Sequence, residues 1–351
     1  MVGLYGDPDT TWGIAVELCF DEPMPLAGVH ERLALLFARH QHLGPTPVIQ
    51  RVSAADWHGQ LQTTAAREFG GDGFLVRVLV SEDHRMLFVA AHHGVCDGLG
   101  LLAVAEEVCQ AGLRPLARGI GQRTSRRAFT ASSVVRVLEA LVRPPARFLG
   151  SAADGEGQEN LDRGTGEVIR ADSASMSYVV TRAFAAWRAT SGGARPRLLV
   201  VVGASRRQPE TLAPDRQTAY LRFPLKREWG LAEVRRQFSL IEPEPDFPET
   251  SALGIGPLVT HLLRGRLGAT ATISNLGIIL GDHLVSVSMF PALNGPQAVA
   301  IGLASTSRTT TVSLRTRASD FTAEESSRLR AMLETELRSA QQGGGKPSRL
   351  A

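Results

Sequence analysis

The chain is short of cysteine and has no long apolar run, and each shortage excludes a class of protein. Its three cysteines, Cys19, Cys96 and Cys109, form no CxxC pair. A disulfide framework or a zinc site normally needs such regularly spaced thiols, so we expect reduced cysteines and no bound metal. The longest apolar stretches, such as residues 198–204, have the length of a strand, whereas a membrane-spanning helix needs about 20 apolar residues. We therefore expect no membrane span.

Lysine is almost absent, and scattered arginine carries the positive charge. Of the 38 basic residues 36 are Arg, and they occur singly or in pairs. Nucleic-acid-binding proteins gather basic residues on one face and often interleave them with aromatic side chains, which make up only 6% of this chain. The sequence therefore predicts no nucleic-acid partner. The first residues, MVGLYGDPD, lack the basic and apolar parts of a secretory signal, so we expect a cytoplasmic protein.

Length and composition predict two globular lobes. The chain has 351 residues, against about 150 for an ordinary domain, and 43% of them are hydrophobic. The composition changes in the middle of the chain, where Pro, Gly and Arg become frequent. We expect an N-terminal lobe over residues 1–115, an inter-lobe connection over 116–172, a C-terminal lobe over 173–340 and a disordered tail over 341–351.

Both halves mix strand patterns with helix patterns. In the first half, residues 12–20 alternate as in a strand, and residues 74–80 and 85–91 are predicted to form a hairpin. A helix is expected over 99–109, and the second half begins with another over 176–190. The fold class is therefore α/β, with two α+β sandwiches that meet at an interface, where ligand sites tend to form.

The sequence HHGVCDG, residues 92–98, lies between an apolar strand and an apolar helix. Successive side chains of a strand point to opposite faces, so His92 and His93 cannot both face one cavity or bind one metal ion. We expect one histidine to support the loop and the other to be presented at the strand end, a favoured place for catalytic groups in α/β proteins. Asp97 is better placed to fix the loop than to act as a base.

A structural role is the competing interpretation for each of these residues. A histidine is more often packed in a core or exposed to solvent than catalytic. Cys96 lies inside the motif without a supporting Cys–His arrangement, which favours a small packed residue over a nucleophile. The catalytic interpretation depends on the whole HHxxxDG pattern rather than on any single residue.

This pattern resembles the motif of the CoA-dependent acyltransferase superfamily. That superfamily includes nonribosomal peptide condensation domains, wax ester synthases, polyketide-associated acyltransferases and chloramphenicol acetyltransferase. The likeness extends over most of the chain. Residues 1–40 resemble the family's opening strand and helix, and they end at 38–40 in a sequence similar to its Arg-His-x-x-Leu. Residues 175–190 resemble the helix that begins its C-terminal lobe. Residues 200–209 and 271–277 resemble its Val-x-Val-Ser-x-Arg strand and its Thr-x-Ser-Asn crossover strand.

The resemblance implies two chloramphenicol acetyltransferase-like lobes with an active-site tunnel at their interface. It implies an acyl thioester donor, either acyl-CoA or a phosphopantetheinyl carrier protein, and a small-molecule acceptor with a hydroxyl or an amine. Beyond these co-substrates it implies no permanently bound cofactor. His93 would be the general base, which an imidazole with an ordinary pKa near 6.5 can be.

The resemblance also implies roles for residues around this base. His92, Asp97 and Gly98 would support the site, and the backbone N–H of Gly98 would also stabilise the oxyanion. Ser274 is a second, less secure oxyanion donor and Asn275 would hold the crossover strand, with a simple turn residue as the alternative. Two arginines, Arg206 and Arg207, would contact the phosphopantetheine phosphate. The alternative is that both side chains are exposed to solvent without such a contact.

Two departures from the family pattern limit this assignment. The arginine that pairs with the motif Asp would fall at Gly44, so Asp97 needs another partner, and Arg51 is a candidate by proximity alone. The Asp-Phe-Gly-Trp-Gly element of condensation domains is absent, which weakens the case for ordinary peptide condensation.

Three functions remain. The first is an acyltransferase or condensation-like enzyme that forms an ester or amide in specialised-metabolite or lipid biosynthesis. The second is a non-catalytic docking module that binds a carrier protein or a partner enzyme. The third is thioester hydrolysis or cyclisation on the same fold, because a base beside a thioester can also activate water.

Overall fold

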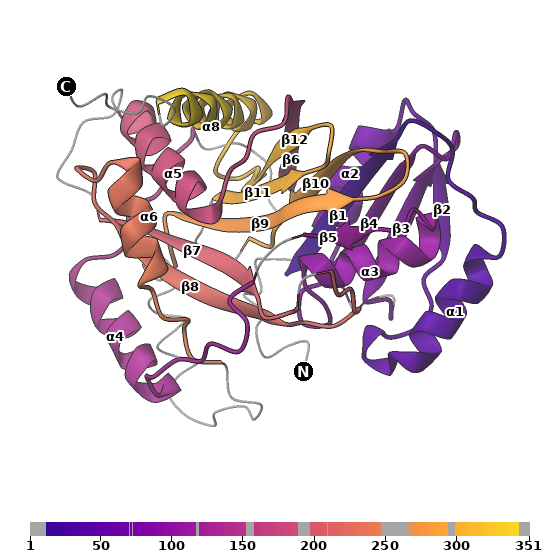
Figure 1. The fold of residues 1–351 in the computed structure, drawn as a ribbon, viewed down its shortest axis with the longest axis horizontal. Helices are drawn as coiled ribbons and strands as arrows, with labels where there is room; N and C mark the ends of the chain where they lie inside the picture. Colours follow the sequence, from indigo (N-terminus) through magenta and orange to yellow (C-terminus); the bar gives the residue numbers. More distant parts are fainter. Residues whose placement is uncertain are drawn as a thin grey trace, which may run out of the picture.

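The computed structural model describes residues 12–69, 71, 73–116, 119–151, 158–188, 197–208, 210–246, 266, 268–293 and 299–343. These residues form two lobes, each built on one β-sheet (Figure 1). The expected α/β fold class is therefore confirmed. Among the described residues, no helix combines the length and the apolarity that a bilayer crossing requires. The expected tail 341–351 begins inside the last helix, and its remaining residues lie outside the described part of the chain.

The N-terminal lobe is a five-stranded sheet between two layers of helices. The strands lie in the order β10 (Leu284–Phe290), β1 (Gly13–Phe20), β4 (Met86–His92), β3 (Val76–Ser81) and β2 (Ile49–Val52). Alternate residues of β1 pack on opposite layers, as a strand requires. Ile14, Val16 and Leu18 pack with helices α1 (Val29–Arg39) and α3 (Gly98–Cys109), whereas Ala15 packs with α2 (Trp57–Ala66). A short 3-10 helix, Gln41–Leu43, follows α1.

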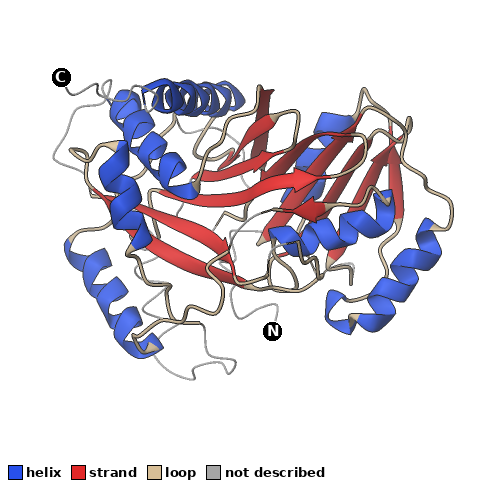
Figure 2. Cartoon of the chain, in the orientation of Figure 1, coloured by secondary structure: helices blue, strands red, loops and turns tan. Residues whose placement is uncertain are grey.

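The C-terminal lobe is a seven-stranded sheet with its main helices on one side (Figure 2). Helices α5 (Ser173–Arg188), α6 (Leu231–Ser239) and α8 (Ala323–Gly343) pack together over it, and α4 (Phe129–Val142) lies apart from α8. The path of the sheet is β6 (Glu159–Gly166), β12 (Thr310–Arg317), β11 (Val299–Ser305), β9 (Ala271–Leu280), β7 (Leu198–Ser205) and β8 (Thr218–Leu225), with β5 (Arg114–Pro115) paired to β9.

Two strands do not follow the expected boundaries of the lobes. Strand β10 falls inside the range 173–340 expected for the C-terminal lobe, yet it pairs with β1 of the N-terminal sheet. Strand β6 falls inside the expected connection 116–172, yet it pairs with β12 of the C-terminal sheet. Pairing partners so distant in sequence leave no local signal, so composition alone could not place these strands.

An ion pair with a buried carboxylate and a buried hydrogen bond also join the lobes. Glu17 of β1 is fully buried and lies 2.6 Å from the Nε of Arg163 on β6. The guanidinium of Arg315 on β12 pairs with Glu159 and donates to the backbone carbonyl of Gly13. Because a buried charge needs its partner, these contacts hold the two lobes in one relative position.

Candidate active site

His93 lies in the short loop that connects β4 to α3. Its backbone N–H donates to the carbonyl of Trp12 at 2.8 Å, which holds the loop beside the start of β1. Its ring is buried between the lobes: Nδ1 lies 3.2 Å from the carbonyl oxygen of Cys96, and Nε2 lies 2.8 Å from the hydroxyl of Tyr220. Tyr220 belongs to β8, so the two lobes meet at this ring.

The surroundings of His93 determine its protonation state. Burial, reinforced by the positive charge of Arg216, lowers its pKa to about 4, so the ring is neutral near pH 7. A neutral imidazole has one N–H, and the Cys96 carbonyl can only accept a hydrogen bond, so we assign the proton to Nδ1. The lone pair of Nε2 then faces Tyr220, whose hydroxyl donates to it. This is the tautomer that a general base at Nε2 needs.

His92 faces a different environment, as the alternation of side chains predicts. Its ring stacks edge-on against Phe69, and its Nδ1 accepts a hydrogen bond of 3.0 Å from the backbone N–H of Gly94. A Cβ at Gly94 would lie 2.8 Å from this nitrogen, so the contact depends on glycine. The two histidines face different surroundings, and the described residues contain no group of three or more His, Cys, Asp or Glu side chains that could hold a metal ion.

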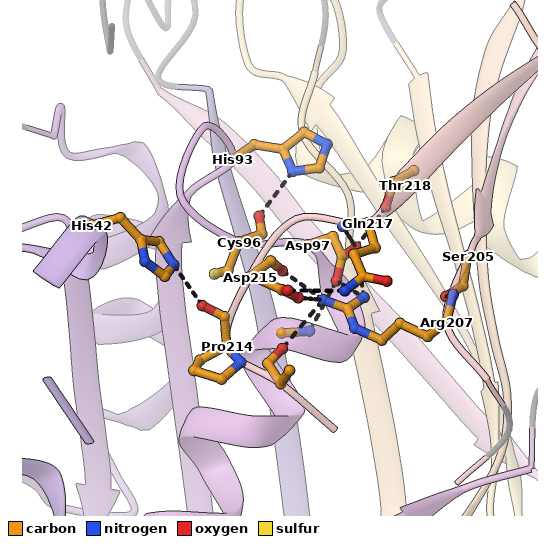
Figure 3. A network of polar contacts seen from close by, with 12 residues as sticks. His42, His93, Cys96, Asp97, Ser205, Arg207, Pro214, Asp215, Gln217 and Thr218 are labelled. Atoms are coloured by element: carbon orange, nitrogen blue, oxygen red, sulfur yellow. Dashed lines mark hydrogen bonds and ion pairs between the residues drawn. The ribbon is translucent and has the colours of Figure 1, made fainter. Parts of the chain in front are cut away.

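Asp97 is the centre of a buried network that crosses from one lobe to the other (Figure 3). Its side chain caps α3 by accepting from the N–H of Gly100 at 2.9 Å. Both of its oxygens lie within 2.7 Å of Nη1 of Arg207 from the C-terminal lobe. It also accepts from the N–H of Gln217 at 2.8 Å and from the hydroxyl of Thr218 at 2.9 Å. With its oxygens so occupied, this carboxylate is suited to holding the loop.

Two arginines lie elsewhere than expected. Arg207 does not fit the expected phosphate contact, because its side chain is only 1% exposed and pairs with Asp97 and Asp215. The expected partner of Asp97, Arg51, is instead exposed on β2, since proximity in sequence did not bring it to the loop. The side chain of Arg206 is 19% exposed and pairs with Asp246 at 2.8 Å, and its contact with a phosphate stays a prediction.

A cavity of about 170 Å³ extends from His93 along the interface of the lobes. Gly98 lines it as the first residue of α3, so its N–H has no acceptor within the helix. Ser274 and Asn275 line it from β9. Asn275 donates to the carbonyl of Ala171 at 3.3 Å and accepts from the N–H of Gly277, which has a positive φ of 71°, so its amide also stabilises the bend of the strand. Apolar side chains form much of the remaining wall, among them Ile14, Leu99, Val202, Leu221, Ile273 and Met289.

Two further residues complete the description of the site. Cys96 is fully buried, and burial raises the pKa of its thiol, which agrees with a packed residue rather than a nucleophile. Tyr220 was not anticipated from the sequence. Its strand pattern predicts only an alternating β-strand, and nothing local distinguishes this residue from any other tyrosine.

The comparisons with known proteins give matches to solved structures only. Neither a protein family nor a curated protein matches the sequence. The structure is similar to a mutant starter condensation domain of rhizomide synthetase RzmA in complex with C8-CoA, with a TM-score of 0.60 and 14% identity over 97% of this chain and 91% of that one.

Two other solved structures are similar over almost the whole chain. The first condensation domain of the calcium-dependent antibiotic synthetase has a TM-score of 0.57 and 14% identity over 98% of this chain and 95% of that one. The wax ester synthase/diacylglycerol acyltransferase of Marinobacter aquaeolei VT8 has a TM-score of 0.57 and 12% identity over 98% of both chains. The chain therefore has the two-lobed fold of these condensation domains and this wax ester synthase.

Proposed function

We propose that the protein is an acyltransferase that moves an acyl group from a thioester, on CoA or a carrier protein, to a hydroxyl or amine acceptor. One observation carries this proposal: His93 is neutral, and its unprotonated nitrogen, Nε2, lies with Tyr220 at a cavity between the two lobes. The fold supports it, because solved relatives of this shape include condensation domains and a wax ester synthase. A relative that holds C8-CoA supports CoA as one form of the donor.

The proposed reaction needs both substrates in the cavity together. His93 removes the proton of the acceptor as its oxygen or nitrogen attacks the thioester carbonyl. The N–H of Gly98 and the hydroxyl of Ser274 are the candidate donors to the oxyanion that forms. When the carbon–sulfur bond breaks, the proton returns from His93 to the leaving thiolate. Asp97 and His92 hold the loop, so positioning supplies part of the acceleration.

The test measures thiol release from short-, medium- and long-chain acyl-CoAs, and from an acylated carrier protein, with and without pooled alcohols and amines. Release that requires an acceptor and yields an ester or amide by mass spectrometry supports the proposal. Equal release without any acceptor would identify a hydrolase, and no release from any donor would favour a docking role. A folded His93→Ala protein distinguishes reaction at this site from reaction elsewhere.

The low pKa of His93 predicts an unusual pH profile. The base must be unprotonated, and its folded pKa of about 4 lies below the ordinary 6.5. Thus kcat/KM should change little as the pH falls from 7 to about 5.5, and should drop only as the pH approaches 4. The measurement is the initial rate of thiol release at low substrate, with circular dichroism at each pH to verify folding. An acid limb near pH 6.5 would show that His93 titrates as an exposed histidine.

A further inference from the structure

Tyr220 occupies the position from which an acceptor would approach the base. Its hydroxyl lies 2.8 Å from Nε2 of His93, and its ring meets the imidazole edge-on at a centroid distance of 6.4 Å. Both residues line the same cavity. Burial raises the pKa of Tyr220 to about 12, so the phenol keeps its proton and donates a hydrogen bond to Nε2. The only lone pair of the neutral imidazole is therefore already used.

An acceptor then has two routes to the base: it displaces Tyr220, or it passes its proton through the phenol. The structure favours the second route, because the start of β8 is tied to the loop that carries His93. Thr218 and the N–H of Gln217 both bind Asp97, which belongs to that loop. Thr218 and Tyr220 are two residues apart on one strand and share a face, so the same carboxylate fixes the phenol opposite the imidazole.

We propose that Tyr220 is a catalytic proton relay between the acceptor and His93. This inference rests on the acyltransferase function proposed above. The acceptor's O–H or N–H bond breaks as its proton passes to the Tyr220 oxygen, while the original phenol proton passes to Nε2. The acceptor forms its bond to the acyl carbon, and the carbon–sulfur bond breaks. The two protons then move back, so that the thiolate becomes a thiol and Tyr220 and His93 regain their starting states.

The first test is Tyr220→Phe, which removes the hydroxyl and keeps the ring. We expect kcat to fall by about 10²-fold, within the range for a lost general acid–base group, with the donor KM little changed. The matched control is Tyr178→Phe, a half-buried tyrosine on α5 outside the cavity lining, which should keep the wild-type rate. A Tyr220→Phe protein as fast as the wild type, or faster, would show that the phenol only covers the base and would overturn the relay.

The second test distinguishes a relay from a tyrosine that merely positions the histidine. Under single-turnover conditions, rates are measured in mixtures of H₂O and D₂O. A relay moves two protons in the transition state, so the wild-type rate should vary quadratically with the deuterium fraction, and that of Tyr220→Phe linearly. A linear wild-type plot beside a slow Tyr220→Phe would overturn the relay but leave the transferase in place. Absence of acceptor-dependent release in the wild type removes the proposed function, and the relay with it.

Discussion

Replacing His93 with alanine is expected to slow acceptor-dependent thiol release by about 10²- to 10⁴-fold, the usual contribution of a general base. The substitution removes the Nε2 lone pair, so no group at 2.8 Å from Tyr220 can take a proton. Donor binding should change little, because the apolar wall of the cavity and the candidate oxyanion donors, Gly98 and Ser274, remain. The measurement compares kcat and KM for one donor and one acceptor.

The control for this prediction is His58→Ala, which removes an exposed histidine of α2 that does not line the cavity. It should retain the wild-type rate. Circular dichroism and thermal unfolding must show that His93→Ala is folded, because the substitution also leaves the Tyr220 hydroxyl without its acceptor. A folded His93→Ala protein that keeps more than about a tenth of the activity would contradict the assignment of the base.

Replacing Arg207 with methionine is expected to lower the free energy of unfolding by about 3–5 kcal/mol, the usual effect of removing one partner from a buried ion pair. The side chain of Asp97 is 3% exposed, and it would lose the charge that compensates it. The loop carrying His93 would then lose its ion pair to the segment that follows β7, although Gln217 and Thr218 would still bind Asp97. Denaturant unfolding measures the change, and acceptor-dependent thiol release from the folded fraction should fall as well.

The adjacent residue supplies the matched control. Arg206→Met removes an ion pair whose acidic partner, Asp246, is 63% exposed, so we expect a change below about 1 kcal/mol. The double variant Asp97→Asn/Arg207→Met should be more stable than Arg207→Met alone, because it leaves no unpaired buried charge. If Arg206→Met and Arg207→Met destabilise the protein equally, the Asp97–Arg207 pair does not have the structural role assigned to it.

The motif and its local structure could be predicted because the relevant forces act between near neighbours. Strand alternation separates His92 from His93, and an aspartate followed by Gly98 and an apolar run is typical of a helix start. In the structure, Asp97 caps α3 and the two rings face different surroundings. The helix predicted over 99–109 begins one residue earlier, at Gly98.

The partners of these residues could not be predicted, because they come from distant parts of the chain. Arg207 is 110 residues from Asp97, and Tyr220 is 127 residues from His93. A strand pattern, such as the one that residues 200–209 resemble, leaves the partner of a side chain open. The sequence predicts either a phosphate contact or solvent exposure for Arg206 and Arg207, whereas Arg207 is buried in the lobe interface.

The amino-acid sequence by itself determined the class of fold, the loop that carries His93 and the turn chemistry around it, since periodicity and motif spacing act over a few residues. Only the tertiary structure decided that β10 pairs with β1, that Arg207 neutralises Asp97 and that Tyr220 faces His93. The physical reason is that register between distant strands, and the burial it produces, depend on the packing of the whole chain. Buried charges and hydroxyls acquire their partners only when the two lobes close on each other.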